Sequence, residues 1–152
     1  MKKVLFMLAI FIAGADASGY NVKDITKCSK GDSFACNSIG LLYESGKEVK
    51  KNLSKAKKYY EKSCQLEYGE GCQNLAQTFI KEENYNSASA YYSEGCHLDN
   101  SNACSEIAFL YEKGKGVKIN YSQAKKYHEK ACDLGNEKSC KNYTYLDKNG
   151  IS

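Results

Sequence analysis

Several features that define large protein classes are missing from this 152-residue chain. It has no proline, no tryptophan and no arginine, and only two histidines. Its net charge of +4 is small for a protein that binds nucleic acid, and we predict no nucleic-acid partner. No apolar run reaches the length of about 18 residues that a membrane-spanning helix needs. With 42% apolar and 26% charged residues, the composition is typical of one globular domain and excludes collagen-like and low-complexity chains.

The first 17 residues have the pattern of a secretory signal peptide. Lys2 and Lys3 precede an apolar stretch, Val4–Ala15, and Ala15-Asp16-Ala17 is typical of a cleavage site. The apolar stretch has 12 residues, which is too short for a membrane anchor. We therefore predict a signal peptide at 1–17 and a single mature domain at 18–152 without a membrane span. Such a protein is secreted or periplasmic.

Eight cysteines form four pairs with the same spacing, C-x7-C, and the first members of the pairs are 36, 32 and 36 residues apart. A period of about 36 residues is typical of solenoid proteins. Zinc ligands are usually two to four residues apart, and the chain has no C-x-x-C, so we predict no metal and no cofactor. An even number of cysteines in an exported chain favours oxidation within the equivalent pairs. The predicted disulfides are Cys28–Cys36, Cys64–Cys72, Cys96–Cys104 and Cys132–Cys140.

Each repeat predicts two helices. The first contains the second cysteine of a pair, and positions 0, +3, +4 and +7 relative to it form one helical face of small, apolar or aromatic residues. The second helix contains the first cysteine of the next pair and carries Ala, Tyr and an aromatic residue or His at positions −8, −5 and −4. Gly46 and Gly114 are predicted to end two of the first helices, and Asn52 and Asn120 to begin the second helices that follow.

The cysteine spacing also predicts a turn inside each pair. Eight residues of continuous helix span about 12 Å, whereas a disulfide needs Cα atoms within about 7 Å. We expect these turns at Gly31, Gly69, Asn100 and Gly135. The repeat units then run over about 33–68, 69–100 and 101–136, with half-repeats at both ends. The middle unit lacks four residues between its helices.

The clearest copy of the repeat, Ala103–Cys132, reads ACSEIAFLYEKGKGVKINYSQAKKYHEKAC and resembles the Sel1-like repeat, a relative of the tetratricopeptide repeat. The C-x7-C pairs and the signal peptide resemble the secreted cysteine-rich Sel1-repeat proteins of the Helicobacter type, the Hcp proteins. The resemblance implies an all-α, right-handed α/α solenoid held by four disulfides. Its departures are the short middle repeat and His128 in a position that is aromatic elsewhere.

Proteins of this type are described as penicillin-binding proteins or weak β-lactamases, so the resemblance implies β-lactam binding or hydrolysis as an alternative activity. The spacing S-x-x-K occurs at Ser54/Lys57 and at Ser122/Lys125. In serine β-lactamases this spacing puts a nucleophile and a lysine on one helical turn, but the partner motifs S-D-N and K-T-G are absent. Both pairs occupy the same repeat position, where serine is common at a helix start. Repeat sequence therefore explains them better than catalysis.

The two histidines give no catalytic motif. His128 stands where the other repeats have tyrosine, which favours a packed ring over a general base. His97 stands at a variable position, and neither has an acidic or nucleophilic partner nearby in the sequence.

Solenoids of helix pairs usually bind partners on the concave face, which the first helix of each repeat lines. If the tetratricopeptide alignment holds, this face carries the residues one, two and five places after each second cysteine. Amides are frequent among them and can pair with the backbone of an extended peptide; an ordinary solvated helix face is the alternative. They are Asn37, Ser38, Leu41, Gln73, Asn74, Gln77, Ser105, Glu106, Phe109, Lys141, Asn142 and Tyr145.

We predict an exported monomer that binds a peptide, a protein or a peptidoglycan fragment of the cell wall in this concave groove. The alternative that the resemblance implies is β-lactam binding or slow hydrolysis. A third hypothesis is a structural module within a larger envelope complex.

Overall fold

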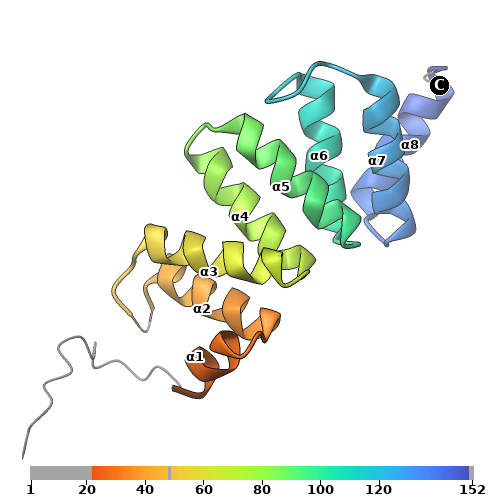
Figure 1. Ribbon diagram of the computed structural model, residues 1–152. Coiled ribbons are helices and arrows are strands. Elements are labelled where there is room, and N and C mark those ends of the chain that lie inside the picture. Colours follow the sequence, from red (N-terminus) through yellow and green to blue (C-terminus); the bar gives the residue numbers. More distant parts are fainter. Residues whose placement is uncertain (1–21, 48, 151–152) are drawn as a thin grey trace, which may run out of the picture.

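The computed structural model describes residues 22–47 and 49–150, which form eight α-helices and, within these ranges, no strand (Figure 1). The predicted signal peptide lies outside the described residues. The helices are α1 (Val22–Ser29), α2 (Ser33–Ser45), α3 (Leu53–Gln65), α4 (Gly69–Lys81), α5 (Tyr85–His97), α6 (Ser101–Lys113), α7 (Tyr121–Asp133) and α8 (Glu137–Lys148).

The helices follow one another as stacked pairs along a curved line, so the prediction of an all-α solenoid is confirmed (Figure 1). Each helix packs on the next one in the chain. In addition, α2 contacts α4, and α4 contacts α6. These contacts between alternate helices place them on the concave side. We call α2, α4, α6 and α8 the inner helices, and α1, α3, α5 and α7 the outer helices.

All four predicted disulfides are present, and each joins the end of an outer helix to the start of the next inner helix. The Cα–Cα distances are 4.5–4.8 Å, within the range that a disulfide allows. Closing a loop of about nine residues stabilises the fold by roughly 2.5 kcal/mol in the chain-entropy model. The bridges therefore fix the angle at every junction between repeats, where each helix pair alone buries little surface.

The turns inside the cysteine pairs are partly as predicted. Gly31 and Gly135 have positive φ angles of 95° and 88°, as expected for turn residues. In the other two pairs the positive φ belongs to Glu67 and Asp99, so the prediction of turns at Gly69 and Asn100 is wrong. Asn100 instead caps α6 by accepting a hydrogen bond from the Ala103 N–H.

Gly69 begins α4 and is small for a packing reason. A Cβ there would lie 3.0 Å from the carbonyl oxygen of Leu98 and 3.0 Å from the Cβ of Asn100. The glycine therefore allows the turn between α5 and α6 to approach the start of α4.

The helix ends predicted from glycine and asparagine are confirmed. Gly46 and Gly114 end α2 and α6 in the left-handed conformation, and their N–H groups donate to carbonyls four residues back. The Asn52 and Asn120 side chains accept hydrogen bonds from the backbone of the first turn of α3 and α7.

The interior is built from small residues and stacked aromatic rings. Gly40 faces the ring of Tyr60, and a Cβ on this glycine would lie 2.5 Å from the Tyr60 Cδ1. In each complete repeat, the aromatic residue at +7 of the inner helix stacks on the tyrosine at −5 of the outer helix. The pairs are Tyr43–Tyr59, Phe79–Tyr91 and Tyr111–Tyr127, with ring centroids 5.5–5.8 Å apart.

Candidate functional site

A cleft of about 300 Å³ opens on the concave side between α6 and α8. Four of the predicted groove residues line it: Ser105, Glu106 and Phe109 on α6, and Asn142 on α8. The Phe109 ring is 43% exposed although it is large and apolar. The cleft therefore combines one accessible aromatic surface with several hydrogen-bonding groups, which is the composition of a ligand site.

Three further residues line this cleft and were missed in the sequence: Glu112, His128 and Lys138. Glu112 is seven residues after Ser105 and three after Phe109. Residues at these spacings lie on the same face of a helix, so extending the predicted face by one turn would have included Glu112. His128 comes from α7, an outer helix, and no pattern within the inner helices could indicate it.

His128 is buried, with 2% of its surface exposed, and it joins three helices. Its Nε2 lies 3.0 Å from Oε1 of Glu112 on α6, and its Nδ1 lies 3.1 Å from the Ser139 hydroxyl on α8. Burial lowers the pKa of His128, and the opposing effect of Glu112 is smaller. The ring is therefore neutral at pH 7. Because a carboxylate can only accept, Nε2 donates to Glu112 and Nδ1 accepts from Ser139.

This order of serine, histidine and acid resembles a hydrolytic triad, but the serine has no access to a substrate. Ser139 is fully buried, with 0% exposed, at the position that small residues occupy in every repeat. The equivalent of the His128–Glu112 pair in the first complete repeat is Tyr60, whose hydroxyl donates to Glu44. The arrangement is thus a structural polar contact of the repeat, as the packed-ring interpretation predicts.

The other predicted groove residues differ in how much of their surface is exposed. Asn37 is only 2% exposed, and its Oδ1 accepts a hydrogen bond of 2.9 Å from Nδ2 of Asn74. This bond ties α2 to α4 and makes Asn37 unavailable as a surface contact, so it is a correction to the predicted binding set. Residues that remain partly or fully exposed on the inner helices are Ser38, Leu41, Gln73, Gln77, Lys141 and Tyr145.

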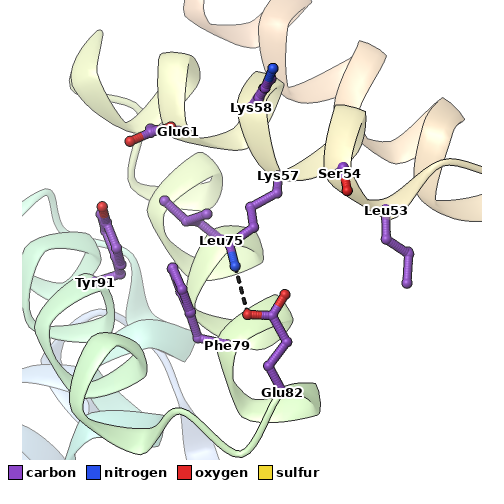
Figure 2. A pocket seen from close by; sticks show the side chains of 9 residues that line it. All are labelled: Leu53, Ser54, Lys57, Lys58, Glu61, Leu75, Phe79, Glu82 and Tyr91. Atoms are coloured by element: carbon purple, nitrogen blue, oxygen red, sulfur yellow. Dashed lines mark hydrogen bonds and ion pairs between the residues drawn. The ribbon is translucent and has the colours of Figure 1, made fainter.

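The S-x-x-K pairs do not form nucleophile–base pairs. Lys57 forms a 2.6 Å ion pair with Glu82, and its Nζ lies 3.8 Å from the centre of the Phe79 ring. Figure 2 shows the Lys57 side chain extending toward Glu82 and away from Ser54.

In the second pair, Ser122 and Lys125, the lysine is also ion-paired with an acidic residue. Lys125 forms a 2.8 Å ion pair with Asp147, and this hydrogen bond raises the pKa of Lys125. A general base needs a lowered lysine pKa, so the Ser122/Lys125 pair fits the interpretation as repeat sequence.

Within the described part of the chain, no helix is long and apolar enough to cross a membrane, and no group of three metal-ligating side chains comes together. Nothing in residues 22–47 and 49–150 therefore indicates a metal centre.

The family model of the Sel1 repeat matches residues 33–68 and 101–136. Among solved structures, the chain is similar to cysteine-rich protein B of Helicobacter pylori, with 31% identity, 78% of this chain and 88% of that chain covered, and a TM-score of 0.62. The chain belongs to the Sel1 repeat family. Sel1 repeats are protein-interaction modules, and this disulfide-rich repeat chain is consistent with a protein-binding scaffold.

Two solved structures with lower sequence identity show a similarity of fold alone. A Sel1 repeat protein from Oxalobacter formigenes is 20% identical, with 81% of this chain and 96% of that chain covered and a TM-score of 0.73. A protective antigen of uropathogenic Escherichia coli is also 20% identical, with a TM-score of 0.75 over 84% of this chain and 28% of that chain. No curated protein sequence matches. The disulfides and the likeness to the cysteine-rich Helicobacter protein suggest an extracytoplasmic protein.

Proposed function

We propose that this Sel1 repeat protein acts outside the cytoplasm, secreted or periplasmic, and binds an extended peptide segment of a protein or a cell-wall fragment on its concave face. The observation that carries the proposal is the cleft between α6 and α8, in which the exposed Phe109 ring lies among polar side chains. Aromatic side chains are enriched at binding interfaces, where they often supply the anchoring contacts.

The polar side chains of the cleft suit a peptide backbone. The Asn142 amide offers both donors and an acceptor, and the Ser105 hydroxyl offers one of each. Glu106 and Lys138 give the cleft charges of both signs. A ligand would place an apolar side chain on Phe109 and satisfy its backbone groups with Asn142 and Ser105.

The proposal is tested by selecting peptides from a random display library, and by titrating defined muropeptides, against the oxidised chain. The variant Phe109→Ala should weaken the selected ligand about tenfold or more, as expected for a central aromatic anchor. Tyr121→Ala is the matched control, because Tyr121 is 47% exposed but lies on the outer helix α7. It should leave the affinity within about twofold.

Equal effects of the two variants, or no selected ligand at all, would contradict the proposal. The same preparation should be incubated with a penicillin. Turnover that is lost in Ser54→Ala or Ser122→Ala would instead establish the hydrolase alternative, which has no supporting geometry at these positions.

A further inference from the structure

The linker between α6 and α7 differs in charge from the other linkers of its kind. Three linkers join an inner helix to the following outer helix, and they cover residues 46–52, 82–84 and 114–120. The last of them contains two lysines and no acidic residue, whereas the first contains one glutamate and the second contains two. The whole stretch 113–128 has no aspartate or glutamate. All of its charged side chains are therefore basic.

This linker has a fixed conformation. The Asn120 N–H donates a 3.0 Å hydrogen bond to the carbonyl oxygen of Tyr111. Gly116 lies so close to the backbone of Tyr85 that a Cβ on this glycine would overlap the Tyr85 carbonyl oxygen. Val117 packs against the core cluster of the neighbouring helices. Because these contacts hold the linker on the core, the side chains on its outer side form a defined surface.

Two large apolar side chains are exposed at the end of the linker and the start of α7. Ile119 is 59% exposed and Tyr121 is 47% exposed. In the first repeat Lys51 stands at the position of Ile119, so the repeat does not require an apolar residue there. Adjacent exposed apolar side chains in a fixed segment indicate a contact surface.

Three exposed lysines lie on the same edge of the solenoid. They are Lys115, Lys118 and Lys148, and within the described ranges none of them forms an ion pair. The 2.8 Å ion pair between Lys125 and Asp147 joins the start of α7 to the end of α8. Figure 1 shows the end of α8 on the same side of the molecule as the linker. We call Lys115, Lys118, Ile119, Tyr121 and Lys148 the basic edge.

The neighbouring acidic residues do not cancel this charge. Asp147 is already paired with Lys125, and Glu82 on the adjacent linker is paired with Lys57. Glu83 is the other acidic residue of the adjacent linker, and it is exposed. Three lysines against one carboxylate leave the basic edge positive.

Lysines beside exposed aliphatic and aromatic side chains suit the surface of a lipid bilayer. Anionic headgroups attract the lysines, while apolar side chains enter the boundary between headgroups and acyl chains. Tyrosine is enriched at this boundary because its ring is apolar and its hydroxyl is polar. A soluble polyanion would pair with the lysines but leave Ile119 in water. The apolar side chains therefore favour a bilayer.

We propose that the basic edge docks this protein on the surface of a lipid bilayer with anionic headgroups. Ile119 and Tyr121 enter the headgroup–acyl boundary, and the three lysines lie beside headgroup phosphates. None of these residues lines the concave cleft, so the docking surface is separate from the site under Proposed function and does not depend on it. The docking is peripheral and reversible, because only a few side chains enter the lipid.

The test measures co-sedimentation with vesicles. The oxidised chain without residues 1–17 is used, because the apolar stretch Val4–Ala15 would itself bind lipid; residues 22–150 contain the eight helices and the four disulfides. The vesicles consist of phosphatidylcholine alone or of an equimolar mixture with phosphatidylglycerol. We expect at least about tenfold stronger partitioning onto the anionic vesicles, and a steep loss between about 50 and about 500 mM salt because exposed charges are screened.

A double variant tests the lysines. Lys115→Gln/Lys118→Gln should weaken partitioning onto anionic vesicles about 20-fold, since each lysine near an anionic surface contributes about fivefold in affinity. The control Lys30→Gln/Lys62→Gln removes the same charge at the opposite edge, beside the first two disulfides. It should leave partitioning within about threefold of wild type, because charges beyond a Debye length are screened.

A single variant tests the apolar contact. Ile119→Ser should weaken partitioning about fivefold, as expected when an aliphatic side chain no longer enters the lipid. The matched control is Phe34→Ser, because Phe34 is 63% exposed but lies in the first turn of α2, at the disulfide edge. It should change partitioning by less than about twofold. Thermal unfolding of each variant checks that it is folded.

Partitioning onto anionic vesicles that both Lys115→Gln/Lys118→Gln and Ile119→Ser weaken, and that neither control weakens, supports the proposal. No partitioning, equal partitioning onto phosphatidylcholine alone, or equal losses in test and control variants overturns it. Binding that Ile119→Ser leaves unchanged, and that soluble polyphosphate competes for fully, also overturns it and assigns the lysines to a soluble polyanion.

Discussion

The hydrogen bond between the Tyr60 hydroxyl and Glu44 joins the two helices of the first complete repeat, and its contribution to stability can be measured directly. Tyr60 is fully buried, and its hydroxyl donates a 2.6 Å hydrogen bond to Oε2 of Glu44, whose other oxygen accepts from Lys81. The variant Tyr60→Phe removes this donor and keeps the ring that packs on Gly40. A hydrogen bond to a charged group contributes about 1.5–3 kcal/mol. Because Glu44 retains Lys81, we expect a loss of about 1.5–2 kcal/mol in the free energy of unfolding.

The middle repeat provides the matched control. Tyr92 occupies the same position and is equally buried, but Ile80 stands where Glu44 stands in the first repeat. Within the described ranges, the Tyr92 hydroxyl forms no hydrogen bond with another residue. Replacing an unpaired buried hydroxyl by hydrogen is nearly neutral or stabilising. Tyr92→Phe should therefore change the free energy of unfolding by less than about 0.5 kcal/mol.

The assay is urea unfolding of both variants with the disulfides intact, at several pH values. Burial alone would raise the pKa of Glu44, but the hydrogen bonds from Lys81 and Tyr60 outweigh burial, and the pKa lies below its ordinary value of 4.5. A carboxyl with a lowered folded-state pKa stabilises the fold above 4.5 and loses this contribution as the pH falls below it. The gap between wild type and Tyr60→Phe should thus shrink in acid. Equal losses for Tyr60→Phe and Tyr92→Phe, or a gap independent of pH, would refute the reasoning.

Three further perturbations test the packing, the bridges and the histidine. Gly40→Ala places a methyl group against the Tyr60 ring and should cost about 1–3 kcal/mol in urea unfolding; unchanged stability would show that α2 can move away. The Cys132–Cys140 disulfide is partly exposed, whereas the cysteines of the other three are buried, so brief reduction and alkylation should label this pair first in a peptide map. Burial lowers the pKa of His128, so the wild type should lose stability as the pH falls below 6.5, and His128→Tyr, which recreates the tyrosine–glutamate pair, should not show this loss.

The sequence was sufficient to predict the fold because the same cysteine spacing and the same helix-capping residues recur in several repeats. The C-x7-C spacing allows a short bridge only if the chain turns, and the four bridges follow from it. Asparagine and glycine at the linker ends determine the helix bounds through their own backbone contacts, as Asn52 and Gly46 show. These are interactions between residues close in the chain, and their chemistry can be read from spacing.

The concave residues were predicted less completely, because accessibility depends on what packs against a helix. Asn37 and Ser105 occupy equivalent positions, one residue after the second cysteine of a pair, yet Asn37 is buried by its bond to Asn74, while Ser105 lines a cleft. The place of these two residues in the repeat does not distinguish them. The difference arises from neighbouring helices.

The sequence alone determined the solenoid, its bridges and the set of inner-helix residues that could face a ligand. Only the tertiary structure decided that His128 contacts Glu112 and Ser139 and that Lys57 is paired with Glu82. The sequence could not predict these contacts because the residues that form them are far apart along the chain. These contacts join residues 11 to 25 positions apart, from different helices or, for Glu82, from the C-cap of α4. Their geometry exists only after the helix pairs have stacked.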